Sequence, residues 1–488
     1  MRVALVQCPA WGALPPLGPA SLKAYVEQHG HEARCFDLNI SFYNQFQAEK
    51  LALELDGRVY GGPDPWGADS YGQWGLDYDT WADAIAFEPG SIYNDEPLPL
   101  QAWADEILAW EPAVIGFTTY LTSFASSLLL ARELKERRPD LLLVFGGPNT
   151  AKDREGDIAL LTGLVDVTVH GEGEATLLAL LEALERGDDL AGVEGIGRLV
   201  DGTPVWTPFR PLIRPLDQLP YPDFSDFDWF DYPNPYLIPI MGTRGCVLSC
   251  AFCYETVYWK RFRMMSPERV VDEIEHQVRN HPHWGRLPDG KHFYMMFGDS
   301  LVNGHLRTLR DMCDLLIERD LGVMWGGQAT IDKRMDDEVC RQLKAAGCTG
   351  FAVGLESGSQ RVLDDMGKKF QVEDAVDVIR RFAEVDMPLT VNVMVGFPTE
   401  RRRDFLATIG FLFRTRRWLY QVSNVTSTQM ALGSEMYLHP ERFGAQIHDD
   451  GSWSSEATGD ERHRRRRLRA LHFCMKALKI PHQGMAPG

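Results

Sequence analysis

The sequence contains no long apolar run, and it has fewer basic than acidic residues. No stretch of about 18 apolar residues occurs, so no membrane-spanning helix is expected. The chain carries 50 Lys and Arg against 69 Asp and Glu, a formal net charge of −19. Because phosphate groups are bound mainly by Lys and Arg, this balance argues against a general binder of nucleic acid or of anionic membranes. The opening MRVALVQCPAW has too short an apolar run for a secretory signal peptide.

Cysteine is scarce outside one short motif. Nine cysteines occur in 488 residues, and three of them fall between residues 246 and 253. This distribution does not indicate a disulfide framework, and we expect free thiols in a reducing, cytoplasmic environment. Four others lack the clustering that an auxiliary iron–sulfur centre needs and are interpreted as structural: Cys313, Cys340, Cys348 and Cys474.

The first part of the chain alternates strand and helix patterns. Strands are predicted at residues 2–7, 32–38, 113–119, 141–146 and 165–170, and helices at 19–29, 123–138 and 175–185. This alternation indicates an α/β fold, with a doubly wound, Rossmann-like parallel sheet over residues 1–200. Ligands of such sheets bind beyond the carboxyl ends of the strands. The G-x-G-x-x-G fingerprint does not follow the first strand, so a dinucleotide ligand is not expected.

Two segments interrupt the alternation. Residues 41–99 form an aromatic insertion, and an excursion of this length is usually a lid or a functional loop, although packing of the insertion on itself is an equal alternative. Its aromatic residues include Tyr60, Trp66, Tyr71, Trp74, Tyr78, Trp81 and Tyr93. Residues 201–235 are rich in Pro, Asp and aromatics, and they are predicted to be an extended linker strapped across the surface between two domains.

The second domain, residues 236–432, repeats strand then helix. Strands are predicted at residues 236–241, 292–297, 322–328, 350–355, 389–396 and 421–430. Six such units predict a partial (β/α)6 barrel of the TIM type, which places its chemistry at the carboxyl ends of the strands. Ser266 followed by Pro267 predicts the start of the first long helix.

Residues 433–488 are predicted to form a C-terminal helical extension, with a helix at 468–480. The run from Arg462 to Arg469 is interpreted as a solvated helix face. A contact with an acidic substrate or with a reductant protein is the alternative.

Directly after the first barrel strand, Cys246, Cys250 and Cys253 form the pattern C-x3-C-x2-C. Thiols at this spacing can converge on one iron–sulfur cube, which has four irons and normally takes four thiolates. With no fourth cysteine nearby, one iron is left open to a ligand that is not protein, and Phe252 would pack against that ligand. A structural zinc site is the alternative, although such sites usually have four protein ligands.

The cysteine triad, with an aromatic residue before its last member, resembles the signature of the radical S-adenosylmethionine (SAM) enzymes. The resemblance implies a [4Fe–4S] cluster on Cys246, Cys250 and Cys253, and a SAM molecule bound at the open iron and cleaved to a 5′-deoxyadenosyl radical. The segments FGDS (297–300), GLESGS (354–359) and VNVMVGFPTE (391–400) resemble later motifs of the same family. The SAM-binding residues that this resemblance implies are Phe252, Gly298, Asp299, Ser300, Gln328, Glu356, Ser357, Asn392 and Gly396. Many relatives have an arginine near the end of the third strand for the SAM carboxylate, and Gln328 would have to replace it.

The N-terminal domain resembles the cobalamin-binding domain found ahead of many radical SAM modules, through its order of elements, GGPN (146–149) and GEGEATLLALLEAL (171–184). Many such domains ligate cobalt with a histidine after the first strand. The loop from Cys8 to Gly18 contains no histidine, so Tyr120 and Leu121 are expected beneath the ring instead. The cobalamin contacts implied by the resemblance are Leu17, Tyr120, Leu121, Thr122, Ser123, Gly146, Gly147, Gly171, Glu172, Gly173 and Glu174.

Together these resemblances imply a cobalamin-dependent radical SAM methyltransferase with a [4Fe–4S] cluster, SAM and cobalamin as cofactors. It would transfer a methyl group to an unactivated carbon of a small-molecule or peptide substrate, with a flavodoxin or ferredoxin as electron donor. Two alternatives stay open. One is an enzyme of the same architecture that catalyses cyclisation, oxidation or carbon–carbon bond formation without methyl transfer. The other is a non-catalytic cobalamin or redox sensor.

Overall fold

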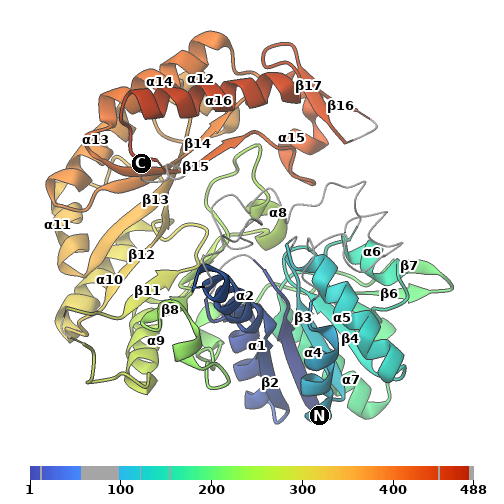
Figure 1. Ribbon diagram of the computed structural model, residues 1–488. Coiled ribbons are helices and arrows are strands. Elements are labelled where there is room, and N and C mark those ends of the chain that lie inside the picture. Colours follow the sequence, from blue (N-terminus) through green and yellow to red (C-terminus); the bar gives the residue numbers. More distant parts are fainter. Residues whose placement is uncertain are drawn as a thin grey trace. The chain divides into compact units, whose positions relative to one another are not determined.

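The computed structural model of the protein describes residues 1–10, 14–55, 98–120, 122–152, 155–288, 290–448 and 451–482. The chain divides into two compact units, Met1–Tyr236 and Leu237–Gly488 (Figure 1). Among the described helices, none combines the length and the apolar character that a bilayer crossing requires.

The first unit is built on a seven-stranded sheet in the order β2–β1–β3–β4–β5–β6–β7. The first five strands in this order are parallel and confirm the predicted doubly wound sheet. They are β1 (Arg2–Gln7), β2 (Glu32–Asp37), β3 (Val114–Thr118), β4 (Leu142–Gly146) and β5 (Val167–Val169). The strand order reverses between β1 and β3, and ligands of such folds bind at this point, beyond the carboxyl ends of the strands.

Two further strands, β6 (Ile196–Val200) and β7 (Thr203–Trp206), extend this sheet in antiparallel fashion and were not predicted. Asp201 and Gly202 join them, with φ angles of 49° and 77°. An Asp-Gly pair with two positive φ angles is a preferred two-residue hairpin turn, because its twist matches that of the strands. The Asp-Gly pair was therefore a usable signal in the sequence.

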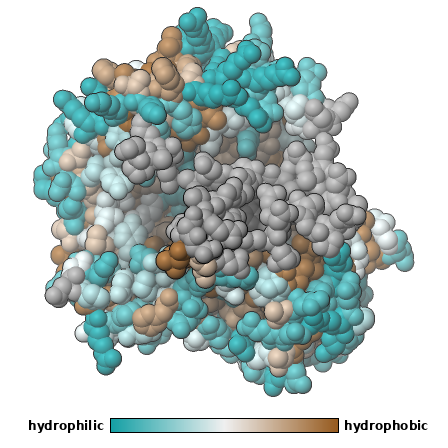
Figure 2. Space-filling view, viewed as in Figure 1, coloured by the Kyte–Doolittle hydropathy of each residue, from teal (hydrophilic) through white to brown (hydrophobic). Residues whose placement is uncertain are grey.

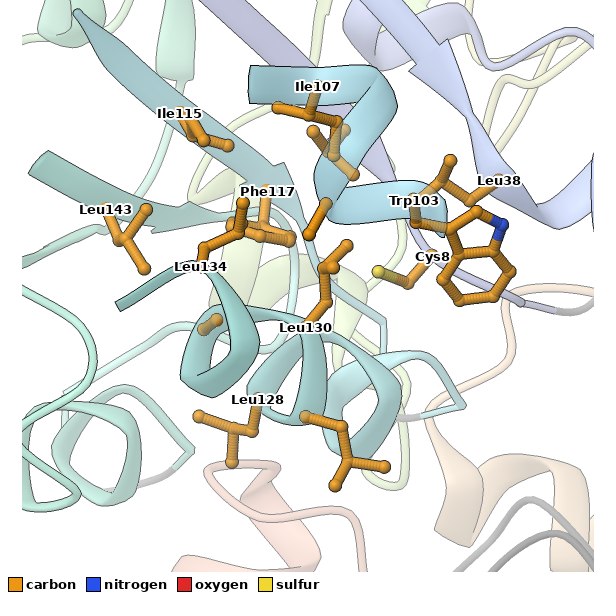
Figure 3. Packing of buried hydrophobic residues seen from close by; sticks show 14 of the residues in the cluster. Cys8, Leu38, Trp103, Ile107, Ile115, Phe117, Leu128, Leu130, Leu134 and Leu143 are labelled. Carbon is orange, nitrogen blue, oxygen red and sulfur yellow. The ribbon is translucent and has the colours of Figure 1, made fainter. Parts of the chain in front are cut away.

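One face of this sheet packs against two helices, α4 (Leu100–Ala109) and α5 (Phe124–Arg137), in a continuous apolar core. Figure 3 shows Ile107 of α4 and Leu130 of α5 close to Phe117 of β3. The other α-helices in the described part of the unit are α1 (Leu17–Gln28), α2 (Leu38–Leu55), α6 (Glu155–Leu161) and α7 (Gly173–Arg186).

The first part of the predicted insertion is helical, because residues 41–55 belong to α2. Leu38 and Phe42, one helical turn apart, are buried in the core, and this spacing explains why the segment is a helix. Residues 56–97, which include all seven aromatic residues named above for the insertion, lie outside the described residues.

The segment predicted as a linker between domains packs on the first unit. Phe224, Trp229 and Tyr232 are among its buried side chains. The Tyr232 hydroxyl donates a hydrogen bond to Oδ2 of Asp37 at 2.7 Å. The short helices η3 (Leu216–Gln218) and η4 (Trp229–Asp231) lie in the same segment. Its aromatic residues therefore act as anchors.

The second unit contains six parallel strands in chain order, which confirms the predicted partial (β/α)6 barrel. They are β8 (Leu237–Ile240), β11 (Tyr294–Phe297), β12 (Met324–Ala329), β13 (Cys348–Glu356), β14 (Leu389–Val395) and β15 (Leu419–Ser427). The intervening helices are α9 (Pro267–Asn280), α10 (Leu306–Arg319), α11 (Asp337–Ala345), α12 (Gln360–Met366), α13 (Val372–Glu384) and α14 (Arg402–Thr415). Ser266 caps α9 as predicted, because its Oγ accepts the backbone N–H of Arg269.

The C-terminal extension is not only helical. It contains α15 (Glu435–Leu438), η5 (Pro440–Phe443), the hairpin of β16 (Ala445–Ile447) and β17 (Trp453–Ser455), and α16 (Glu461–Ala477). In Figure 2, hydrophilic and hydrophobic side chains are mixed on the visible surface where Figure 1 places α14 and α16.

The prediction that the arginine run from Arg462 to Arg469 forms a solvated helix face is correct only in part. Arg464 is 3% exposed and stacks over the Trp453 ring at 3.7 Å, and Arg467 forms an ion pair with the buried Glu400. Two arginines of the run therefore hold the extension against the barrel.

Candidate functional site

The cysteine loop follows β8 and lies between the short strand β9 (Thr243–Arg244) and the helix α8 (Glu255–Trp259). β9 pairs with β10 (Arg263–Met264), which closes the loop at its base. Gly245 has a φ angle of 83°, and a Cβ there would lie 2.8 Å from the carbonyl oxygen of Arg261. Only glycine fits this turn without strain, and the turn brings Cys246 to the carboxyl end of the first barrel strand.

Two backbone hydrogen bonds fix the middle of this loop. Ala251 donates its N–H to the carbonyl of Met366 at 2.9 Å, and its own carbonyl accepts the N–H of Met436 at 2.8 Å. Gly367, which ends α12 with a φ angle of 82°, packs against Ser249. The loop is therefore anchored on one side by α12 and on the other by α15.

The three thiols lie in a partly desolvated environment. Burial raises the pKa of all three above its ordinary value, and the pKa of Cys253 reaches about 11. The positive charge of Lys368 acts in the opposite direction on the pKa of Cys246 and Cys250. Free thiols at this site are thus protonated at neutral pH, and they become thiolates when a metal displaces the protons.

The donor set fits an iron–sulfur cube better than a single metal ion. Among the described residues, no group of three or more His, Cys, Asp or Glu side chains converges as the ligands of one ion do. A structural zinc site usually takes four protein ligands, whereas this loop supplies three cysteines. An iron–sulfur cube takes cysteine thiolates as ligands, and the three cysteines of this anchored loop would supply them.

The predicted SAM-binding residues occupy the carboxyl ends of consecutive strands in the second unit. Gly298, Asp299 and Ser300 follow β11, and Gln328 lies near the end of β12. Of these residues, Gly298 and Gln328 are exposed. Ser300 donates a hydrogen bond from its hydroxyl to the carboxylate of Glu255, just beyond the third cysteine. The structure therefore links the FGDS segment to the cysteine loop.

Asp299 is engaged within the protein. Its side chain is 1% exposed, and Oδ2 accepts the N–H of Gly242 at 3.0 Å. Burial raises the pKa of this carboxyl group to about 6. Asp299 also borders a cavity of about 30 Å³ between α9 and α10. Its predicted contact with SAM stays a prediction.

The ESGS segment divides into two roles. Glu356 ends β13 with a φ angle of 65°, at a point where the pairing with β14 shifts register. A non-glycine residue in this region is strained by about 1–3 kcal/mol, and such strain is concentrated at functional sites. Ser357, by contrast, is fully buried, and its hydroxyl lies 3.3 Å from that of Thr408 on α14.

The predicted residue of β14, Asn392, and Gly396 directly after the strand also contact protein groups. Asn392 accepts a hydrogen bond from the Ser423 hydroxyl at 2.7 Å. Gly396 has a φ angle of 78°, and a Cβ there would lie 2.7 Å from Cγ of Arg464. The space beside Gly396 is therefore filled by α16, and a close approach of adenine would have to use another side of this backbone.

In the first unit, the predicted glycines make close contacts with the protein itself. A Cβ on Gly147 would lie 2.6 Å from the carbonyl oxygen of Thr119, and one on Gly171 would lie 2.8 Å from the Phe209 ring. Gly173 begins α7 and faces Leu22 of α1, whereas Gly146 has more room. These glycines let neighbouring segments of the protein pack closely at the strand ends. Because that space is already filled, we expect direct contact with a flat ligand such as cobalamin chiefly from other groups.

The other predicted cobalamin contacts lie at the same edge of the sheet. Tyr120 is 39% exposed, and Ser123 accepts its N–H at 3.0 Å. Glu172 accepts the N–H of Ile213 at 2.8 Å, and Glu174 is buried. Leu17 begins α1 and Thr122 precedes α5. Leu121 lies outside the described residues.

Two residues at the end of β1 bear on whether cobalamin fits. Cys8 is buried beside Leu38 and Trp103 (Figure 3), and burial raises its pKa to about 12, so it is a core residue and not a cobalt ligand. Gln7 is 7% exposed, and its Oε1 has no hydrogen-bond partner within the described part of the chain. An unpaired buried amide is costly, so a ligand that donates to it would fit at this edge.

The model of the Radical SAM superfamily matches residues 240–412. These residues form a radical SAM domain. The matched residues begin at the end of β8 and contain the cysteine loop and every strand end that carries a predicted SAM contact.

Three named relatives extend the likeness beyond the radical SAM domain. An uncharacterised methyltransferase, PH0819, from Pyrococcus horikoshii is 25% identical over 67% of this chain and 73% of its own length. The anaerobic magnesium-protoporphyrin IX monomethyl ester cyclase of Rubrivivax gelatinosus is 28% identical over 61% of this chain and 53% of its own length. The cobalamin-dependent radical SAM methyltransferase TokK of Streptomyces tokunonensis is 27% identical over 64% of this chain and 46% of its own length. The chain thus spans about half the length of the last two.

Two solved structures share the fold over most of the chain. The radical SAM methyltransferase TsrM from Kitasatospora setae, solved with cobalamin and a [4Fe–4S] cluster, has a TM-score of 0.65 at 18% identity, over 94% of this chain and 81% of that one. The cobalamin-dependent radical SAM enzyme OxsB, solved with aqua-cobalamin and SAM, has a TM-score of 0.63 at 16% identity, over 90% and 55%. The predicted architecture, a Rossmann-like domain ahead of a partial barrel, is confirmed.

Three residues near the site were missed by sequence reasoning: Gln7, Glu255 and Lys368. Glu255 lies two residues beyond the triad, so its closeness could have been noticed. Gln7 ends a buried strand, and Lys368 follows a glycine that ends a helix. Neither pattern reveals that the side chain is buried, because burial is set by the tertiary contacts.

Proposed function

We propose that this protein is a cobalamin-dependent radical SAM methyltransferase that transfers a methyl group to an unactivated carbon of a small-molecule substrate. The observation that carries the proposal is the anchored C-x3-C-x2-C loop at the carboxyl end of β8, in a chain whose first unit is a doubly wound sheet. The same combination of domains occurs in TsrM and OxsB, and TokK carries this activity in its name.

Cys246, Cys250 and Cys253 would hold the [4Fe–4S] cluster, and SAM would bind at its open iron. When bound, the cluster and SAM supply hydrogen abstraction from an unactivated C–H bond, and cobalamin supplies the methyl group. The backbone bonds of Ala251 keep the cysteine loop in place while these groups bind. Gln328 and Glu356, at neighbouring strand ends, would orient SAM.

At the edge of the first unit, the Gln7 amide and the exposed ring of Tyr120 would contact cobalamin. A corrin carries many amide side chains, which suit a buried amide acceptor. No histidine occurs between Cys8 and Gly18, so the lower face of cobalt would lack an imidazole ligand from this loop. Electrons would come from a flavodoxin or ferredoxin, and the protein would work in the reducing cytoplasm, where its thiols stay free.

A second candidate is a radical cyclase of the same architecture. It is favoured by the 28% identity to the magnesium-protoporphyrin IX monomethyl ester cyclase, which exceeds the identity to either methyltransferase above. Both candidates use the same cysteine loop, so the loop does not separate them.

The products formed from SAM separate the candidates. The anaerobically reconstituted protein is incubated with methyl-labelled SAM, cobalamin, a strong reductant and three probes: tryptophan, magnesium-protoporphyrin IX monomethyl ester and 2-(S-pantetheinyl)-carbapenam-3-carboxylate. Methyl transfer predicts label in a product together with S-adenosylhomocysteine and 5′-deoxyadenosine. A product without label, formed with 5′-deoxyadenosine alone, supports the cyclase. If SAM stays intact in the presence of a full cluster and cobalamin, both enzymatic proposals are wrong.

A further inference from the structure

A buried ion pair lies beside the cysteine loop. The Lys368 side chain is 7% exposed and that of Glu356 is 12% exposed. Nζ of Lys368 lies 3.2 Å from Oε1 of Glu356 and donates a hydrogen bond to the carbonyl of Gly354 at 2.9 Å. The ammonium group is therefore held at one point by β13.

The ammonium group of Lys368 lies close to the cysteine loop. It lies 5.7 Å from the centroid of the Phe252 ring, the residue between Ala251 and Cys253. Its charge interacts with the thiols of all three cysteines of the triad. The preceding residue, Gly367, lies against the backbone of Ser249, so the chain beside Lys368 is in contact with the cysteine loop.

Stability alone does not explain this pair. Removing two charges from water costs several kcal/mol, and a buried ion pair is often no better for stability than well-packed apolar side chains. Glu356 also carries backbone strain at its φ angle of 65°. A fixed positive charge in a low-dielectric site, however, has a strong effect on any charge that changes nearby.

We propose that Lys368, held by Glu356, is a positioning residue that fixes a positive charge beside the [4Fe–4S] cluster and makes the cluster easier to reduce. Reduction adds one electron, and hence one negative charge, to a group already bound by three thiolates. The ammonium group stabilises that reduced state more than the oxidised one, and Glu356 opposes it. This inference rests on the proposed function, because it requires the cluster.

The test is an anaerobic redox titration of the reconstituted full chain without substrate, followed by the electron paramagnetic resonance signal of the reduced cluster. The Lys368→Met variant is expected to hold about tenfold less reduced cluster at a given potential, a shift of about 59 mV to more negative potential. Lys368→Arg keeps the charge and should restore most of the wild-type value. Glu356→Gln removes the opposing charge and should shift the potential in the positive direction. Lys369→Met, which removes an exposed charge one residue away, is the matched control and should leave the potential unchanged.

The outcomes separate this inference from the proposed function. If the wild-type protein binds no [4Fe–4S] cluster, the proposed function itself is wrong. If the wild type binds the cluster and Lys368→Met titrates like it, the inference is overturned while the function stands. Should Lys368→Met fail to hold a cluster, Glu356→Gln decides: a positive shift supports the inference, and an unchanged or negative shift overturns it.

Discussion

Arg467 donates a hydrogen bond from Nη1 to Oε2 of Glu400 at 2.6 Å. The same carboxylate oxygen accepts the backbone N–H of Gly396 at 2.8 Å, and the Glu400 side chain is 1% exposed. One arginine of the C-terminal extension therefore neutralises a buried carboxylate that holds the turn after β14. The extension is thus part of the barrel's structure at the edge where the predicted SAM contacts lie.

The first prediction concerns this pair. Arg467→Ala leaves the Glu400 carboxylate buried without its cation, and breaking such a pair typically costs about 3–5 kcal/mol. We expect the free energy of unfolding to fall by that order, measured by denaturant titration. Arg466→Ala, which removes the exposed neighbouring arginine, should change it by less than about 0.5 kcal/mol. Equal effects of the two variants would contradict the structural role of Arg467.

The second prediction concerns the cysteine loop. Cys250→Ala removes one of three thiolates, so the reconstituted variant should lose most of its iron and sulfide and all cleavage of SAM. Cys474→Ala, which changes a half-buried cysteine of α16, is the control and should keep both. The measurement is iron and sulfide content together with 5′-deoxyadenosine formation. An intact, SAM-cleaving cluster in Cys250→Ala would contradict the assignment.

The third prediction concerns pH. Burial raises the pKa of Asp37 from 3.8 to about 6, so the folded state binds its proton more tightly than the unfolded state does. The contribution of this group to the free energy of unfolding is then largest below about pH 4. It falls by about 3 kcal/mol as the pH rises to about 6, at about 1.4 kcal/mol per pH unit. Asp37→Asn should lack this slope, so the free energy of unfolding of the wild type relative to that of the variant should fall between pH 4 and pH 6. A difference that is independent of pH between 4 and 6 would contradict it.

The Tyr232 hydroxyl gives a second check of the same group. Its hydrogen bond favours the ionised carboxylate of Asp37. Tyr232→Phe should therefore raise the pKa of Asp37 further and extend the loss of stability to higher pH.

The fourth prediction compares two glycines of the first unit. Gly147 and Gly163 both have positive φ angles, 109° and 70°, but only Gly147 has backbone atoms in the space where a Cβ would lie. Gly163→Ala should cost about 1–2 kcal/mol from the backbone conformation alone. Gly147→Ala should cost clearly more, because its Cβ would lie 2.6 Å from the Thr119 carbonyl oxygen. Thermal unfolding of both variants measures the difference, and equal costs would show that the strand ends tolerate the contact.

Local patterns in the sequence were sufficient for much of the fold. Buried parallel strands are short apolar runs, and β1 and β14 were predicted within one residue of their observed ends because such runs are bounded by polar or turn residues. The hairpin of β6 and β7 was missed although its Asp-Gly turn is a local signal. The helical start of the insertion was not predicted, because the aromatic and turn-forming residues beyond Leu55 indicate a loop and the whole segment was assigned with them.

The sequence by itself determined the cysteine spacing and the alternation of strands and helices, because both depend on residues close together in the chain. Only the tertiary structure decided that Lys368 reaches the cysteine loop, that Arg464 covers Gly396 and that Asp299 bonds to Gly242. These contacts join residues from 57 to more than 100 positions apart. Their side chains are brought together by the closure of the sheet and by the return of α16, which no local pattern encodes.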